Sequence, residues 1–579
     1  MHPQRWLINL EKGKKHPKRW QINPPLTPIA DGALSAFHPI LRQILFNRGY
    51  PTFAEAQNYL AVRLPFDTSP WQLTGIGPAI ERLEYAIDHT EAVSIYGDYD
   101  VDGVTATALL VQTLQALGAN VHGYIPNRFD EGYGLNQDAL ESLAAQDVKV
   151  VVTVDCGIRS PSEVAHARAV GLDLIITDHH QPSGELPQAY AIINPKQAGD
   201  MYPDKDLAGV GIAYKIAEAL LEKRPSDRLI PEDLLDLVAL GTVADLVPLT
   251  GENRSLVRKG LQHIRETQRQ GLFSLANVAD LDIKRTTATN IGYILGPRLN
   301  AAGRLESALS ALELLTTKDV QTAGRLAQQL NAQNRVRQEL TRSMQEQAEA
   351  IILMKDPGAL VLFAVDPGFN TGVVGLVASR LTDTFYRPAI VGQRSDETTR
   401  CSCRSIPEFH ITQALDQCAD LLVRHGGHAA AAGFTVRNEN YNELVIRMET
   451  IASEKLAGHD LRPTLMADAE VSLYDLKPQL LDDLELLQPT GYGNPEAIFV
   501  SRKLRISNAR TVGADGQHLK LTVTDGKLTF DAIAFRLGHL QPGLPTHVDL
   551  LYTFEVNEYN GRKTLQLNVR DLKPSGGLD

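Results

Sequence analysis

Three aspartates alternate with other residues in the stretch Tyr96-Gly97-Asp98-Tyr99-Asp100-Val101-Asp102-Gly103. An apolar strand, residues 92–96, ends there, and a helix opens at Val104. Open α/β sheets bind their ligands at this end of a strand. Carboxylates this close repel one another unless cations lie between them, and hard oxygen ligands suit Mg²⁺ or Mn²⁺. The alternative interpretation is one helix-capping aspartate beside two solvated turn acids.

Two further strands end in residues that could bind a metal. The strand that ends at Val154 runs into Asp155-Cys156-Gly157, and the strand that ends at Thr177 runs into Asp178-His179-His180. Neighbouring strands lie about 4.8 Å apart, so these tips can surround two metal ions about 3.5–4 Å apart. We interpret Cys156 as a buried small residue, because a soft thiolate suits this oxygen-rich set poorly.

Asp245 is a further candidate ligand. It follows an apolar helical run that begins at Ala239, and an acid that merely ends a helix or turn is the alternative. Two cations would neutralise a phosphodiester, lower the pKa of a bridging water and stabilise the leaving oxygen, so this chemistry needs no covalent nucleophile. A histidine ligates only as neutral imidazole, so falling pH should release the metal.

Composition limits the class of protein. The 579 residues, with 43% hydrophobic and 22% charged residues, suit a soluble protein of several domains. The sequence has neither an apolar run long enough for a membrane span nor a secretory signal, and its four cysteines are too few for a disulfide framework. We therefore expect a cytoplasmic protein. A net charge of −12 still permits a locally basic groove.

The pattern of apolar segments predicts an α/β protein. Continuous apolar strands that alternate with helices indicate a parallel sheet covered on both faces. A second α/β unit follows a helical connector with a long exposed helix, and short alternating strands predict a small all-β domain at the end. The expected segments are an N-terminal arm (1–75), the metal-binding domain (76–280), the connector (281–355), the second α/β domain (356–460) and the all-β domain (461–579).

Several motifs resemble those of the DHH phosphoesterase superfamily, and in particular its RecJ branch. The stretch 97–103, the triplet Asp155-Cys156-Gly157 and the triplet Asp178-His179-His180 resemble the superfamily motifs. Segments 126–135, 296–304 and 426–434 resemble the RecJ branch. The matches span nearly the whole chain in the right order. The later domains would be DHHA1 and a C-terminal OB-fold, which binds single strands by stacking bases and contacting phosphates.

The resemblance implies a single-strand-specific exonuclease that degrades DNA from its 5′ end with two Mn²⁺ or Mg²⁺ ions. Asp155 would bridge the ions, and His180 would either ligate metal or stabilise charge on the phosphoryl oxygens. Whether Asp98 ligates directly stays open, because related phosphoesterases place their first ligands differently. The implied metal ligands are Asp98, Asp100, Asp102, Asp155, His179 and Asp245, and the implied catalytic residues are Asp100, Asp102, Asp155, His179 and His180.

The resemblance also implies substrate-binding residues. Glycines let backbone N–H groups approach a phosphate, and arginine supplies a two-pronged anion contact. For His428 the alternative is a packed core histidine. Asn370 and Thr490 depart from the pattern, since relatives often have histidine and phenylalanine there. The implied set is Arg128, Asn300, Arg304, Ser402, Arg404, Gly426, Gly427 and His428. In the OB-fold, Phe530, Tyr552 and Phe554 would either stack on bases or pack in the core.

The implied partner is single-stranded DNA, handled by a monomer in DNA repair and recombination, with a helicase and a single-strand-binding protein as further partners. A ring of domains would exclude duplex DNA, which is too wide for a narrow channel. Two other functions are alternatives. A phosphodiesterase for short oligonucleotides or nucleotide phosphates would not need an OB-fold, and a DNA-binding scaffold would have lost metal ligands that this chain retains.

Overall fold

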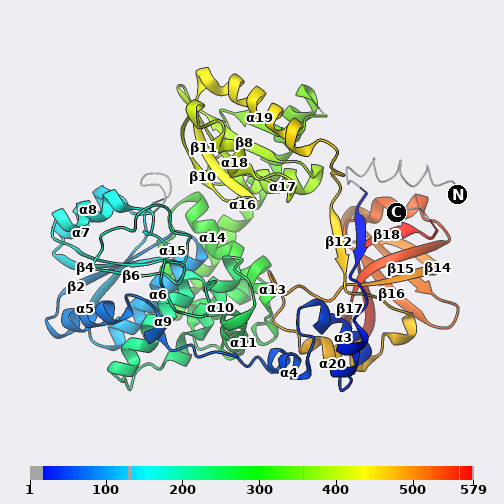
Figure 1. The fold of residues 1–579 in the computed structure, drawn as a ribbon, viewed down its shortest axis with the longest axis horizontal. Helices are drawn as coiled ribbons and strands as arrows, with labels where there is room; N and C mark the ends of the chain where they lie inside the picture. The colour runs from blue at the N-terminus through cyan, green and yellow to red at the C-terminus, as the bar shows by residue number, and fades with distance from the viewer. Residues whose placement is uncertain (1–16, 128–133, 357, 560, 577–579) are drawn as a thin grey trace. The chain divides into compact units, whose positions relative to one another are not determined.

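The computed structural model describes residues 17–127, 134–356, 358–559 and 561–576 (Figure 1). They fall into two compact units. The metal unit contains Asn58–Arg337 and Leu487–Pro495. The second unit contains the described residues up to Gln57, Gln338–Leu486 and the described residues from Glu496 onward.

A parallel sheet of five strands, in the order β3-β2-β4-β5-β6, lies at the centre of the metal unit. Its strands are β2 (Ala92–Gly97), β3 (Asn120–Tyr124), β4 (Val148–Val154), β5 (Asp173–Thr177) and β6 (Ala191–Ile193). Because all five run in one direction, their carboxyl ends share one edge of the sheet. The predicted strand ends at Val154 and Thr177 are confirmed.

Helices cover both faces of this sheet (Figure 1). Alternate strand residues face opposite sides. Val150 and Val152 pack among α5 (Ile76–Asp88), α6 (Val101–Ala116) and α9 (Gly209–Lys223). Val151 packs on the other side, among α7 (Gln137–Ala145) and α8 (Pro161–Ala169). The prediction of a sheet buried on both faces is therefore confirmed.

Helices follow the sheet in the metal unit. The last turn of α10 (Leu235–Ala244) ends at Asp245, and α10 packs against α6 and α11 (Gly251–Arg265). The remaining helices are α12 (Gln270–Val278), α13 (Ala288–Asn290), the π-helix η4 (Ile291–Leu295), α14 (Gly296–Leu305) and α15 (Leu309–Thr316). The predicted long helix is α16 (Val320–Lys355), and its residues continue into the second unit.

The second unit contains a mixed sheet in the order β10-β11-β9-β8-β7. Only β7 and β8 pair in parallel. Its elements are β7 (Leu362–Asp366), α17 (Val374–Phe385), β8 (Ala389–Arg394), β9 (Thr398–Arg404), α18 (Ile411–Asp416), β10 (Leu422–Gly427), β11 (Ala431–Arg437) and α19 (Tyr441–Leu456). The predicted second α/β domain is confirmed, although most of its strands are antiparallel.

Five C-terminal strands close into a barrel, as an OB-fold requires, because β14 pairs with both β15 and β17. The barrel strands are β14 (Phe499–Val512), β15 (His518–Thr524), β16 (Thr529–Ala534), β17 (His547–Tyr559) and β18 (Arg562–Pro574), and β13 (Ala469–Glu470) pairs outside the barrel. Tyr552 is fully buried and bonded to Ser501, and Phe554 is also buried. A base-stacking role is therefore wrong for these two rings, which pack in the core.

The described part of the predicted N-terminal arm has its own secondary structure. Strand β1 (Arg19–Ile22) pairs in parallel with β12 (Thr464–Ala467), and the Trp20 indole N–H donates to Asp571 at 2.8 Å. Helices α2 (Pro28–Ala33), α3 (Pro39–Asn47) and α4 (Phe53–Ala61) follow. Residues 19–61 of the N-terminal arm therefore contain a strand and three helices. Among the described residues, every helix is too short or too polar to cross a membrane.

Candidate metal centre

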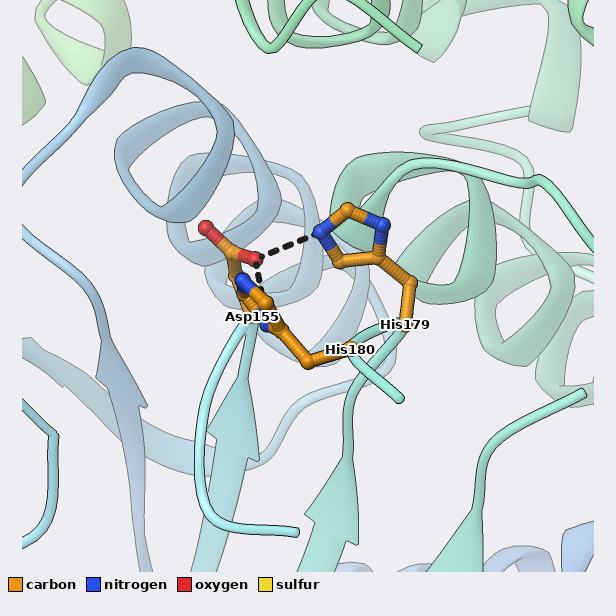
Figure 2. Close-up of side chains that lie close together, drawn as sticks. All are labelled: Asp155, His179 and His180. Atoms are coloured by element: carbon orange, nitrogen blue, oxygen red, sulfur yellow. Dashed lines mark ion pairs between the residues drawn. The ribbon is translucent and has the colours of Figure 1, made fainter. Parts of the chain in front are cut away.

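The carboxyl edge of the parallel sheet gathers the predicted metal ligands. Asp98 follows β2, Asp155 follows β4, and His179 and His180 follow β5. Figure 2 shows the two imidazoles directed at the Asp155 carboxylate, where His179 Nε2 lies 3.1 Å and His180 Nδ1 lies 3.8 Å from Asp155 Oδ1. Three strands that are separate in sequence thus place their side chains at one point.

Three overlapping groups of side chains have the spacing of metal ligands, with the ligand atoms of each group within 4.8 Å of one another. The groups share members, since Asp155 belongs to two of the three and His179 also belongs to two, with the first group common to both. They are Asp155, His179 and His180; Asp102, His179 and Asp245; and Asp98, Asp100 and Asp155. All seven predicted ligand and catalytic residues of this domain therefore lie in one continuous site.

Two aspartates of the first motif are tied to helix N-termini. Asp100 Oδ1 caps α6 by accepting the backbone N–H groups of Asp102 and Gly103. The Asp102 carboxylate accepts the N–H groups of Gly209 at 2.6 Å and Val210 at 2.8 Å, at the start of α9. A helix N-terminus favours negative charge, so each helix helps to hold an acid in place. The helix-capping alternative is correct for Asp100, whereas Asp98 and Asp102 are buried rather than solvated.

Glycines allow the close approach of backbone to acid. A Cβ on Gly209 would lie 2.8 Å from Asp155 Cβ and 2.9 Å from Asp102 Oδ2. A Cβ on Gly103 would lie 2.4–2.7 Å from the Asp98 backbone. Asp155 itself has a φ of +62°, a region that costs energy for an aspartate. The site thus requires glycine at both positions, and the backbone of Asp155 is held in a strained conformation.

Burial and mutual repulsion raise the pKa of the clustered acids. Burial raises the pKa of Asp102 to about 7, and the neighbouring Asp100 adds to the shift. Burial and then the charge of Asp102 raise the pKa of Asp155 and Asp245 well above the usual range. Burial lowers the pKa of His179 to about 3, which keeps its imidazole neutral and able to ligate. Without a cation, these carboxyls hold protons that metal binding would displace.

His180 differs from His179 because Asp178 pairs with it. Asp178 Oδ1 lies 2.7 Å from His180 Nδ1 and also accepts the His180 backbone N–H. Burial lowers the pKa of His180, but the hydrogen bond to Asp178 and the negative charge of Asp178 together outweigh the effect of burial, so the net shift is upward. Asn194 holds the same turn by donating to the His180 carbonyl at 2.9 Å. His180 is therefore suited to carry positive charge, whereas His179 is not.

The orphaned polar atoms of the site fit a metal ion. Asp155 Oδ1 and both ring nitrogens of His179 are buried and make no hydrogen bond within the described residues. A buried polar atom without a partner costs about 1–3 kcal/mol, so such atoms need an explanation. Carboxylate oxygens and neutral imidazole nitrogens are the donors that Mn²⁺ and Mg²⁺ accept.

The predicted substrate residues of the metal unit have separate positions. Asn300, on α14, accepts the Val101 backbone N–H at 3.2 Å through its side-chain oxygen, so it contacts the first metal motif directly. Arg304 lies four residues later, half-buried, in the last turn of α14. Between them, a Cβ on Gly303 would lie 2.6 Å from the Tyr99 carbonyl oxygen. Arg128 lies outside the described residues.

The predicted phosphate residues lie side by side on the mixed sheet of the second unit. Ser402 on β9 pairs with Gly433 on β11, and Gly433 pairs with Gly426 on β10. Arg404 donates to Ser402 Oγ at 3.3 Å. His428 is exposed, which excludes the packed core alternative.

The start of α17 lies against the same sheet face. A Cβ on Gly375, in the first turn of α17, would lie 3.1 Å from Ser402 Oγ. Gly427 adopts a φ of +151°, and a Cβ there would lie 2.4 Å from the Ala431 carbonyl oxygen, so the turn before His428 requires glycine.

Sequence reasoning missed the residues that position the ligands. Asp178 was visible as part of its motif, but its role toward His180 depends on the turn geometry. Gly209 and Val210 contact Asp102 across more than 100 residues. No local pattern marks them, because a helix that begins at Gly209 has no side-chain cap.

Family models match three parts of the chain. Residues 92–242 match the DHH family N-terminal domain, residues 357–454 match the DHHA1 domain, and residues 467–571 match the RecJ OB domain. The fold and the site thus define a DHH-type phosphoesterase with a DHHA1 domain and an OB-fold.

Proteins similar to this chain show which branch of the DHH-type phosphoesterases it belongs to. The chain is 37% identical over 563 residues to the single-stranded-DNA-specific exonuclease RecJ of Bacillus subtilis, covering 96% of this chain and 71% of that one. It is 35% identical to the Escherichia coli enzyme of the same name, covering 93% and 96%. The crystal structure of Thermus thermophilus RecJ with Mn²⁺ aligns with a TM-score of 0.82 at 30% identity, over 97% of this chain and 81% of that one. The chain belongs to the RecJ family.

Proposed function

We propose that this chain is a metal-dependent exonuclease that hydrolyses the phosphodiester bonds of single-stranded DNA from the 5′ end. The observation that carries the proposal is the continuous cluster of Asp98, Asp100, Asp102, Asp155, His179, His180 and Asp245 at the sheet edge. The relatives support the substrate, since they are named single-stranded-DNA-specific exonucleases.

Two Mn²⁺ or Mg²⁺ ions would be held by Asp98, Asp100, Asp102, Asp155, His179 and Asp245, with Asp155 shared between them. The ions would supply charge neutralisation of the phosphodiester and activation of water. His179 offers a neutral imidazole nitrogen. His180, whose pKa is raised by the hydrogen bond and charge of Asp178, would stabilise negative charge on the phosphoryl oxygens. Structures of Thermus thermophilus RecJ with Mn²⁺ and with Mg²⁺ support this choice of ions.

The second unit would bind the phosphate of the strand. Arg404 and Ser402 on β9, with the turn at Gly426, Gly427 and His428, combine a guanidinium, a hydroxyl and exposed backbone at one sheet face. A guanidinium makes a two-pronged contact with phosphate. Arg128, Asn300 and Arg304 would contact the strand from the metal unit.

The setting of the reaction is part of the same proposal. The OB-fold would hold the single strand. We expect a cytoplasmic monomer that acts in DNA repair and recombination, with a helicase and a single-strand-binding protein that deliver its substrate.

Digestion of end-labelled DNA tests the proposed function. The purified chain, with Mn²⁺ or Mg²⁺, should release mononucleotides from the 5′ end of single strands and should digest strands with a 5′ phosphate faster than those without. Blunt duplex should resist. Equal digestion of blunt duplex and single strands would contradict the single-strand specificity, and release from the 3′ end would contradict the polarity.

A second substrate series addresses the short-oligonucleotide alternative. Rates on dinucleotides and on long strands should differ in favour of long strands, because only long strands can contact the OB-fold. Faster hydrolysis of dinucleotides would favour the alternative.

A further inference from the structure

Two exposed tyrosines flank the short segment that carries Asp245. This segment, residues 243–249, runs from the last turn of α10 to Leu249. Leu246 follows Asp245 directly, is 68% exposed, and has a φ of +62°, a costly conformation for leucine. The segment thus holds an apolar side chain in solvent next to a candidate metal ligand.

Tyr293 lies on one side of this segment. Its ring is 81% exposed and sits in the π-helix η4, a form that occurs frequently at functional sites. Helix η4 packs against the end of α10, since a Cβ on Gly292 would lie 3.9 Å from Val243 Cγ1 and one on Gly296 would lie 3.5 Å from Ala244 Cβ.

The same helical run then reaches the first metal motif. It continues from η4 into α14, where Asn300 accepts the Val101 N–H. The run that carries Tyr293 therefore contacts both segments that supply acids, the end of α10 and the start of α6.

Tyr492 lies on the other side, in the stretch Gln488-Pro489-Thr490-Gly491-Tyr492-Gly493-Asn494-Pro495. Its ring is 65% exposed, while its carbonyl accepts the Leu249 N–H at 2.7 Å. Flanking glycines again allow the approach, because a Cβ on Gly491 would lie 2.7 Å from Leu249 Cδ1 and one on Gly493 would lie 2.9 Å from Pro248 Cβ.

The turn that carries Tyr492 is firmly held in the metal unit. Asn494, which is buried, donates to the carbonyls of Leu487 and Pro489 and accepts the Tyr59 hydroxyl at 2.7 Å. The turn belongs to the metal unit, although the residues on either side of it in the sequence belong to the second unit.

We propose that Leu246, Tyr293 and Tyr492, the apolar rim, form a stacking surface for the bases of the strand that enters the metal centre. Neither tyrosine has a ring contact or a side-chain hydrogen bond among the described residues, and both residues are largely exposed. Bases stack on aromatic side chains for about 1–3 kcal/mol each, and stacking accepts every base. This inference rests on the proposed function, because a single strand is the ligand that presents unstacked bases beside a metal-bound phosphodiester.

Binding without hydrolysis tests the apolar rim. A 5′-phosphorylated single strand with 2-aminopurine at one of its first positions is added to the full chain in EDTA. We expect fluorescence quenching at one or two positions in the unaltered protein, and its loss at one position in Tyr293→Ala or Tyr492→Ala. Tyr293→Phe should retain the quenching, because phenylalanine keeps the ring. Each alanine should weaken binding at least about fivefold, which is the lower end of the stacking energy.

Tyr190→Ala is the matched control. This half-exposed tyrosine belongs to the same unit but precedes β6, at the edge of the sheet opposite the metal centre. Its replacement should leave both quenching and binding unchanged. Quenching that is unchanged in the Tyr293→Ala, Tyr492→Ala double variant would overturn the proposal.

Hydrolysis gives an independent readout. With Mn²⁺, the ratio of kcat/KM for an intact strand to that for a strand with abasic residues near its 5′ end should be at least about five in the unaltered protein. It should approach one in the double variant, which a merely structural role would not produce. An unchanged ratio in the double variant would contradict the proposal that the apolar rim stacks on bases. If the unaltered protein hydrolyses no single strand, the proposed function is contradicted. The quenching assay would still test whether the apolar rim stacks on bases.

Discussion

The parallel sheet of the metal unit and the mixed sheet of the second unit build polar sites in opposite ways. In the metal unit, the site lies at the tips of parallel strands, where buried acids and a neutral histidine crowd together. In the second unit, polar groups lie in a row across a mostly antiparallel sheet, where Ser402, Gly433 and Gly426 are neighbours on three strands. The first site collects negative charge for cations, and the second offers hydrogen-bond donors and an arginine for an anion.

This comparison shows that the burial of a site decides whether it binds a cation or an anion. Buried carboxylates repel one another at high cost, which only a multivalent cation offsets. The cross-strand row is half-buried or exposed, so a phosphate can reach its arginine from solvent without the cost of a fully buried charge. The metal centre should therefore respond to substitution much more strongly than the anion site.

The largest effect is expected from Asp155→Asn. Asp155 belongs to two of the three ligand groups, and its replacement keeps the shape but removes a charge. Loss of several kcal/mol of charge stabilisation corresponds to a fall of at least about 10³-fold in kcat/KM on single-stranded DNA. Strand binding in EDTA should persist. Hydrolysis that survives the substitution would refute the shared role of Asp155.

The metal site was largely predictable from sequence, whereas the anion site was predictable only by resemblance. Apolar runs mark where strands end, so Asp155 and His179 could be placed together without a structure. The row that joins Ser402 to Gly426 depends on the register of antiparallel strands, which the residues themselves do not reveal. For the same reason, contacts between distant segments, such as Asp102 with Gly209, could not be foreseen.

A smaller but clear loss of metal affinity is expected from Gly209→Ala. The added methyl group would lie 2.8 Å from Asp155 Cβ, so α9 or the carboxylate must move. Disturbing a group that orients a ligand typically lowers metal affinity about 10–100-fold. Calorimetric titration with Mn²⁺ measures the effect. Gly324→Ala, on α16 with no atom within 4 Å of the new Cβ, is the matched control and should leave Mn²⁺ affinity intact.

Arg404→Lys tests the anion site on the second sheet. Lysine keeps the charge but loses the two-pronged contact, so we expect about a tenfold rise in KM for strands with a 5′ phosphate. The kcat with saturating strand should change little, and strands without the phosphate should be nearly unaffected. Equal losses on both kinds of strand would assign Arg404 to general strand binding and would weaken the contrast between the two sheets.

The smallest effect concerns pH and the metal-free protein. The pKa of Asp102 is about 7 in the folded chain, well above its unfolded value, and the pKa values of Asp155 and Asp245 are also raised. A carboxyl with a raised folded pKa contributes stability at low pH that is lost as the pH rises through that value. The lowered pKa of His179 has the opposite sign, but its contribution changes only below its unfolded pKa of about 6.5.

Between pH 6.5 and 8, these three acids and His180, whose pKa is also raised, should therefore reduce stability as the pH rises. Each kcal/mol lost from the free energy of unfolding lowers Tm by about 2–4 °C in a domain of about 150–250 residues. Mn²⁺ should reverse the trend, since it binds the deprotonated acids and releases protons. Thermal unfolding in EDTA and in Mn²⁺ measures both curves, and Asp155→Asn should flatten both. A metal-free Tm that rises from pH 6.5 to 8 would show that repulsion among these acids does not govern the sheet edge, and the contrast with the second sheet would fail.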